Sequence, residues 1–117
     1  DLVKSARRIV IPASQRAQEL AAWLRKRPEV SFVAEPKQPV GGIVYFLLRT
    51  EDRDDAFRFA DALDCPKGGS FGHPMTTVLP LGVIESFPAG AIRMAVGWEE
   101  SLEEVTEKLR RAFRRAF

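Results

Sequence analysis

The 117-residue sequence contains a single cysteine, Cys65, and a single histidine, His73. One cysteine cannot form a disulfide within the chain, and a zinc site needs further cysteines or histidines close by. The sequence also lacks an apolar run long enough to cross a bilayer, and it does not open on a secretory signal. We therefore expect a protein of the reducing cytoplasm with no internal disulfide, no metal and no membrane partner.

A strong excess of one charge is also missing, because 18 lysines and arginines nearly balance 16 acidic residues. A formal charge of +2 is little reason to expect a nucleic-acid partner. Basic side chains do gather near the C-terminus, at Lys108, Arg110, Arg111, Arg114 and Arg115. Such a stripe could bind an acidic surface, a membrane or nucleic acid, but we interpret it as a solvated helix face.

The length and composition fit one globular unit. A chain of 117 residues, 45% hydrophobic and 29% charged, can bury one core but not two of comparable quality. We therefore treat residues 1–117 as a single domain. The sequence begins with Asp1 rather than methionine, and we expect it to be a piece of a longer protein.

The periodicity of apolar residues predicts alternating helices and strands. Apolar spacings of three and four indicate amphipathic helices, and continuous or alternating apolar runs indicate strands. The predicted helices are 12–27, 52–63 and the segment after Ser101, and the predicted strands are 30–34, 43–48, 76–79 and 91–96. We expect Val30, Phe32 and Ala34 to share one face of their strand, and 43–48 to be the central strand. This order predicts an α+β fold, a mostly antiparallel sheet with helices packed on one face.

Capping residues support two of these helices. Ser101 and Glu104 form a capping-box pattern, and Thr50 or Asp52 could cap the helix 52–63. We expect the apolar side of that middle helix to comprise Ala56, Phe57, Phe59, Ala60 and Leu63.

Arg93 stands out because it interrupts the apolar strand 91–96. A guanidinium is costly to bury unless a carboxylate meets it, and its planar fork matches a carboxylate in bidentate fashion. From the residues alone, Arg93 could instead face solvent on an edge strand, or pair with Glu85 or Glu99.

Two stretches carry a resemblance to a known family. They are Ser70-Phe71-Gly72 followed by Thr76-Thr77-Val78, and the segment from Gly90 to Glu99, with the sequence GAIRMAVGWE. They resemble the Ser-Leu-Gly, Thr-Leu-Val and Gly-Leu-Ile-Arg-Leu-Ser-Val-Gly-Ile-Glu patterns in the C-terminal domain of the cystathionine synthase and lyase family. That family of fold-type-I pyridoxal-phosphate (PLP) enzymes includes methionine γ-lyase and homoserine sulfhydrylases. The family's His-Pro pair is not in its usual place here.

The resemblance implies that Arg93 holds the α-carboxylate of an amino-acid substrate and that Ser70 assists it. It also implies elimination or γ-replacement on a sulfur-containing or homoserine-derived amino acid, in a homo-oligomeric enzyme. Such enzymes bind PLP in a larger, N-terminal cofactor domain, so we expect the Schiff-base lysine to lie outside this chain and the chain alone to be inactive. Lys67 lacks the serine or threonine that precedes the cofactor lysine in the family.

An alternative of a different class remains open. The chain could be a free-standing α+β module that binds a ligand or a protein without catalysis. His73 and Cys65 have no partners at a spacing that suggests catalysis, so we interpret them as a turn histidine and an idle thiol.

Overall fold

The computed structural model describes residues 13–34, 42–63, 65, 75–97 and 99–117. These residues form three α-helices, one short 3-10 helix and four β-strands. In chain order the elements are α2 (Ala13–Arg25), β1 (Val30–Val33), β2 (Ile43–Leu48), α3 (Asp54–Ala62), β3 (Thr77–Pro80), η1 (Leu81–Val83), β4 (Ala91–Ala95) and α4 (Leu102–Ala116). The predicted succession of helices and strands is confirmed.

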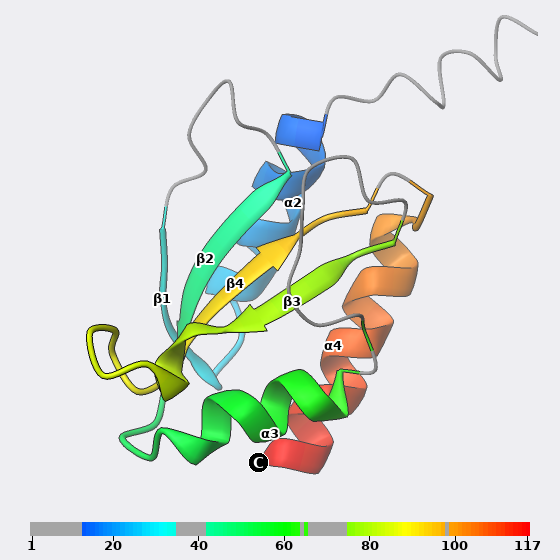
Figure 1. Ribbon diagram of the computed structural model, residues 1–117. Coiled ribbons are helices and arrows are strands. Elements are labelled where there is room, and N and C mark those ends of the chain that lie inside the picture. Colours follow the sequence, from blue (N-terminus) through cyan, green and yellow to red (C-terminus); the bar gives the residue numbers. More distant parts are fainter. Residues whose placement is uncertain (1–12, 35–41, 64, 66–74, 98) are drawn as a thin grey trace, which may run out of the picture.

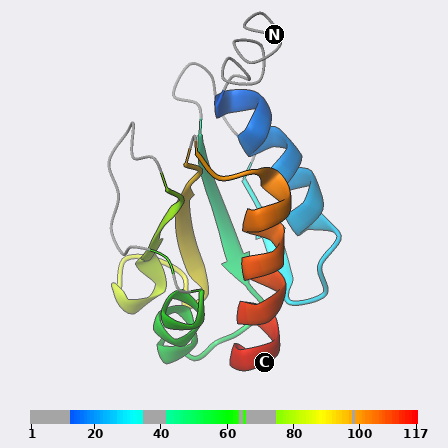
Figure 2. The same cartoon turned by 90° about the vertical axis from the view of Figure 1, so that its right-hand side faces the viewer.

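The four strands form one sheet in the order β1-β2-β4-β3, and every neighbouring pair is antiparallel (Figure 1). Strands β2 and β4 are therefore interior, which confirms residues 43–48 as a central strand. Helices α2 and α4 lie on the same side of the strands (Figure 2). Helix α3 packs against α4 and β3. No α-helix in the described residues covers the other side, which we call the open face (Figure 2). The predicted α+β fold is confirmed.

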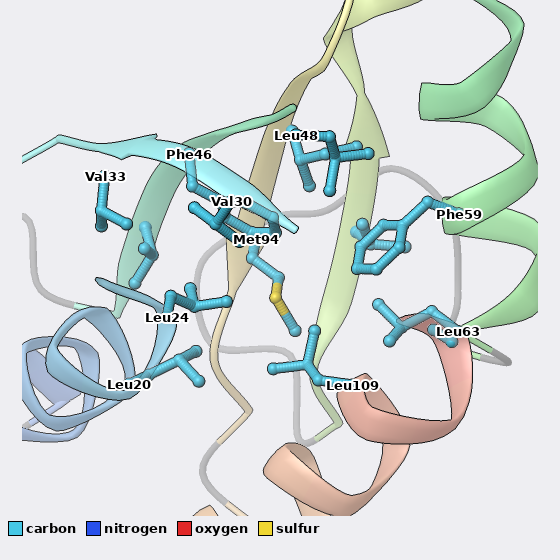
Figure 3. Packing of buried hydrophobic residues seen from close by; sticks show 14 of the residues in the cluster. Leu20, Leu24, Val30, Val33, Phe46, Leu48, Phe59, Leu63, Met94 and Leu109 are labelled. Carbon is cyan, nitrogen blue, oxygen red and sulfur yellow. The ribbon is translucent and has the colours of Figure 1, made fainter. Parts of the chain in front are cut away.

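Alternate strand residues form the core beneath the helices. The strand side chains with less than 2% exposure are Val44, Phe46, Val78, Ile92 and Met94. The ring of Phe46 meets that of Phe59 from α3 edge to face, with centroids 6.0 Å apart. Phe59 in turn contacts Phe113 of α4 at 5.0 Å (Figure 3 shows the packing around Phe59). The core therefore joins the sheet to both helices.

The first strand departs from the predicted alternation. Its pairing with β2 shifts register between Val30 and Phe32. Val33 is buried, whereas Phe32 is 58% exposed. An irregularity of this kind turns the following side chains over to the opposite face. The expectation that Phe32 shares the buried face with Val30 is wrong for this reason.

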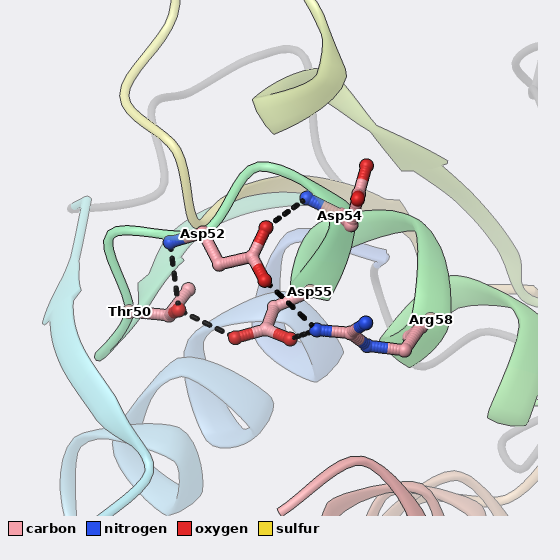
Figure 4. Close-up of polar contacts among 5 residues, drawn as sticks. All are labelled: Thr50, Asp52, Asp54, Asp55 and Arg58. Carbon is pink, nitrogen blue, oxygen red and sulfur yellow. Dashed lines mark hydrogen bonds and ion pairs between the residues drawn. The ribbon is translucent and has the colours of Figure 1, made fainter.

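The N-cap residue of α3 is Arg53, without a side-chain capping bond, so the predicted cap by Thr50 or Asp52 is wrong. The side chains of Thr50 and Asp52 instead bind backbone N–H groups where the chain enters the helix. The Asp52 carboxylate accepts the Asp54 backbone N–H at 3.0 Å, and Thr50 Oγ1 accepts the Asp52 N–H at 3.1 Å (Figure 4). Thr50 Oγ1 also donates to Asp55, and the Arg58 guanidinium donates to Asp52 and Asp55. The hydrogen bond from Thr50 and then that from Arg58 lower the pKa of Asp55.

The buried side of α3 is narrower than predicted. Ala56, Phe59, Ala60 and Leu63 are buried, but Phe57 is 51% exposed. The buried residues follow the spacing i, i+3, i+4, i+7 from Ala56, and Phe57 falls one position outside it. The inclusion of Phe57 in the apolar side is wrong.

Helix α4 begins as its capping pattern predicts. Ser101 Oγ accepts the Glu104 backbone N–H at 3.1 Å. The helix buries Val105, Thr106, Leu109, Ala112 and Phe113 against the core. None of the helices described has the length and apolar character that spanning a bilayer requires.

Candidate functional site

Arg93 lies in the middle of the open face. It is the third residue of β4, paired in register with Tyr45 of β2 and with Leu79 of β3. Its neighbour Met94 points into the core with no exposed surface, so Arg93 points to the side away from the helices. The alternative that Arg93 sits on an edge strand is wrong, because β4 has a hydrogen-bonded strand on each side.

Arg93 has no counter-ion among the residues that the structure describes. The side chain is partly buried. Within the described ranges no carboxylate lies within ion-pair distance of its guanidinium, and Glu85 and Glu99 are exposed and do not pair with it. A guanidinium carries five N–H donors and no acceptor. On a partly desolvated apolar sheet these donors favour a planar anion.

One row along the sheet from Arg93 lies a second polar group without a partner. Thr77 of β3 pairs with Ala95, the residue two positions beyond Arg93 on β4. The Thr77 side chain points to the open face, because the next residue, Val78, faces the core. Thr77 is only 2% exposed, and its Oγ1 makes no hydrogen bond to any described residue. The position of this hydroxyl beside Arg93 could not be predicted from the sequence, because strand register cannot be read from a short apolar run.

An apolar groove lies beside Arg93 on the open face. Its cavity of about 250 Å³ is lined by side chains of β1, β2, β4 and the segment after η1, among them Phe32, Tyr45, Leu47, Phe87, Pro88 and Ala91. Tyr45 lines the groove and also lies next to Arg93 in the register of the sheet. The open face therefore offers an arginine at the margin of an apolar surface.

Arg53 holds one wall of this groove in place. Its guanidinium donates to the backbone carbonyls of Gly82, Ile84 and Phe87 at 2.9, 3.0 and 2.8 Å. With a fourth bond to the Glu85 carbonyl at 3.4 Å, these contacts fix the turn that presents Phe87 and Pro88 to the groove. Sequence reasoning missed Arg53, because an arginine at the start of a helix carries no signal of a contact about 30 residues away.

Two glycines of the segment 90–97 are required by close backbone contacts. A Cβ atom at Gly90 would lie 2.3 Å from the Leu48 carbonyl oxygen, and one at Gly97 would lie 2.3 Å from the Met75 carbonyl carbon. Both distances are shorter than any van der Waals contact allows. The glycines let the two ends of the Arg93 strand approach neighbouring segments, so they serve the position of Arg93 rather than a ligand directly.

The other residues singled out from the sequence fall elsewhere. Ser70, Lys67 and His73 lie outside the described residues. Cys65 is partly buried, and its thiol donates to the Leu63 carbonyl at 3.6 Å. Among the residues described, no group of three or more histidine, cysteine or acidic side chains could hold a metal ion.

The described lysines do not form a cofactor site. Lys26 follows helix α2, and Lys108 lies in α4 with its ammonium group bound to Glu100. Both belong to the helical layer, on the other side of the sheet from Arg93. Neither lysine lines the apolar groove beside Arg93, so the described residues offer PLP no lysine at that site.

Glu100 is the best-partnered charge on the helical side. Its side chain is 6% exposed and accepts hydrogen bonds from the Thr76 backbone N–H and from Lys108. Burial by itself raises the pKa of Glu100, but the hydrogen bonds from Lys108 and Thr76 outweigh burial and leave this pKa lowered. Further along α4, Arg110 and Arg111 both approach the partly exposed Glu107, as expected of a solvated face.

No protein-family model matches the sequence, and no curated protein matches it. Several solved structures, in contrast, are similar to this chain. The O-acetylhomoserine sulfhydrylase of the methionine biosynthetic pathway of Wolinella succinogenes is 28% identical, with a TM-score of 0.70 over 86% of this chain and 33% of that one. MetB from Corynebacterium glutamicum is 18% identical, with a TM-score of 0.73 over 91% of this chain and 33% of that one.

A third similar structure is the putative O-acetylhomoserine (thiol)-lyase MetY from Campylobacter jejuni, which contains pyridoxyl-lysine-5′-monophosphate. It is 16% identical, with a TM-score of 0.67 over 88% of this chain and 29% of that one. The resemblance to the PLP-dependent enzymes of sulfur amino-acid metabolism is thus confirmed. The chain spans about a third of the length of these structures, as one domain of a larger enzyme would.

Proposed function

We propose that the chain is the C-terminal, substrate-orienting domain of a PLP-dependent enzyme that acts in the cytoplasm on a sulfur-containing or homoserine-derived amino acid. The reaction is an elimination or a γ-replacement, catalysed by a homo-oligomer of the longer protein. The role of this domain is to bind the substrate α-carboxylate through Arg93, with Ser70 assisting.

The observation on which the proposal rests is that the Arg93 guanidinium has no ion-pair partner among the described residues. A partly buried cation on an interior strand is stabilised when a carboxylate supplies the missing charge and acceptors. Two parallel N–H···O bonds from one guanidinium would fix the position and the plane of the carboxylate. Fixing the α-carboxylate in this way orients the adjacent substrate carbon atoms, where the reaction takes place.

The apolar groove supports the presence of a second domain. The exposed aromatic side chains Phe32, Tyr45 and Phe87 lie together on the open face, next to Arg93. A contiguous apolar surface beside a charged side chain is typical of an interaction site. The cofactor domain would cover this face and enclose the substrate between itself and Arg93.

The cofactor belongs to that other domain in this proposal, because the described residues offer PLP no lysine beside Arg93. When bound, PLP supplies the electron sink for the bond-breaking step. The residues of this chain contribute by holding the carboxylate and by excluding water from one side of the substrate.

The test is Arg93→Ala in the full-length enzyme. We expect KM for the amino acid to rise roughly 10- to 100-fold, because a hydrogen-bonded charge pair is lost, while the absorbance of the bound cofactor stays unchanged. Arg111→Ala, which removes an exposed arginine of α4, is the matched control and should leave KM unaltered. If Arg93→Ala has the KM of the control, the carboxylate role is wrong.

A further inference from the structure

Thr77 carries a polar group that none of the described residues uses. Its side chain is 2% exposed, and its Oγ1 has no hydrogen-bond partner in the described part of the chain. Buried hydroxyls in folded proteins nearly always find a partner, because an unsatisfied one loses its hydration without compensation. An orphaned hydroxyl on the open face therefore points to a partner that arrives only in another state of the site.

The sheet places Arg93 within reach of this hydroxyl. Leu79, two residues after Thr77 on β3, pairs with Arg93, and Thr77 pairs with Ala95. Thr77 and Arg93 are thus diagonal neighbours on one face of an antiparallel pair, a separation of about 7–8 Å between backbone positions that long side chains bridge. Arg93 has donors without acceptors among the described groups, and Thr77 has an acceptor without a donor.

We propose that Thr77 is a positioning residue for Arg93. In the substrate-bound state its Oγ1 accepts one N–H of the Arg93 guanidinium, which holds the fork in the plane that receives the α-carboxylate. This inference rests on the proposed function of Arg93 and extends it, since Thr77 itself does not touch the substrate. The hydroxyl stays unpaired without substrate, so part of the binding free energy comes from satisfying it.

The proposal predicts an opposite effect of one substitution on stability and on binding. Thr77→Val keeps the branched shape and removes the orphaned hydroxyl, so the thermal midpoint should stay equal or rise. In the full-length enzyme the same change should raise KM about tenfold with little change in kcat, because a hydrogen bond to a charged donor is lost. Thr77→Ser, which keeps the hydroxyl, should restore a KM near that of the unmodified enzyme.

A double-mutant cycle with Arg93 separates this idea from the proposed function. In an Arg93→Ala background, Thr77→Val should add nothing to KM, because its effect acts through the missing guanidinium. If Arg93→Ala raises KM but Thr77→Val does not, the role of Thr77 is overturned and that of Arg93 stands. Full additivity of the two changes also overturns it. If Arg93→Ala leaves KM unchanged, the proposed function fails.

A second variant covers the possibility that valine disturbs the strand. Thr77→Ala also lacks the hydroxyl and is smaller, so the same cycle can be measured with it. A KM that follows the presence of the hydroxyl across valine, alanine and serine supports the proposal. A KM that follows side-chain size instead overturns it.

Discussion

On the helix-covered side of the sheet, apolar side chains are enclosed and the buried carboxylate of Glu100 has two donors. On the open face, aromatic rings are exposed, Arg93 has no counter-ion among the described groups and Thr77 has no hydrogen-bond partner. Both sides are built from the same strands, residue by alternate residue. The contrast shows that the helix-covered side holds the groups that stabilise the fold, whereas the open face holds the groups to which the proposed function assigns a substrate and a second domain.

Two neighbouring aromatic residues of β2 should show the largest difference in stability between the two sides of the sheet. Phe46 is buried and Tyr45 is 46% exposed, so we expect Phe46→Ala to cost about 3–5 kcal/mol of unfolding free energy. Tyr45→Ala should cost less than about 1 kcal/mol. Chemical denaturation of the chain measures both. Equal losses would mean that the open face contributes to stability as the core does.

Glu100 tests whether the buried, hydrogen-bonded carboxylate on the helix-covered side stabilises the fold. Glu100→Gln should reduce the unfolding free energy by about 1.5–3 kcal/mol at neutral pH, because a charged hydrogen-bond acceptor is removed. The folded pKa of Glu100 lies below its ordinary value of 4.5, so its stabilisation is complete above that pH and is lost as pH falls through the lowered value. Denaturation curves of both proteins should therefore converge in acid. A constant difference between pH 7 and 3 would show that the charge is unimportant.

Gly90 tests the positioning of the Arg93 strand. Gly90→Ala places a Cβ against the Leu48 backbone and should cost about 1–3 kcal/mol through overpacking. Ser86→Ala, an exposed position nearby, provides the control, and thermal unfolding measures both. An unaffected Gly90→Ala variant would show that the contact relaxes without strain.

Phe32 should give the smallest effect on the chain alone. Its ring is 58% exposed, so Phe32→Ala should change the unfolding free energy by no more than about 0.5 kcal/mol. In the full-length enzyme the same change should lower the thermal midpoint, because the proposed cofactor domain would cover the ring there. Equal effects in both contexts would argue against an interdomain role for the groove.

The sequence was sufficient for the element order and for the sides of most elements, because apolar periodicity and capping patterns are local signals. Phe32 was misplaced because a register shift depends on the partner strand. Phe57 was misplaced because an apolar residue next to a buried stripe looks like part of it.

For the site, the motif around Arg93 could be recognised in the sequence. That Arg93 lies on an interior strand, without a counter-ion among the described residues, could be seen only in the structure. Arg53 and Thr77 could not be found from the sequence, since their importance comes from groups distant along the chain. Ser70 stays a prediction, because it lies outside the described residues.

The most direct test is the discrimination between the amino-acid substrate and its α-carboxamide, measured as the ratio of kcat/KM values in the full-length enzyme. The unmodified enzyme should prefer the carboxylate by roughly 10- to 100-fold, and Arg93→Ala should lose most of this preference, because the guanidinium is its source. An undiminished preference in Arg93→Ala would contradict the assignment of Arg93 as the carboxylate-binding residue.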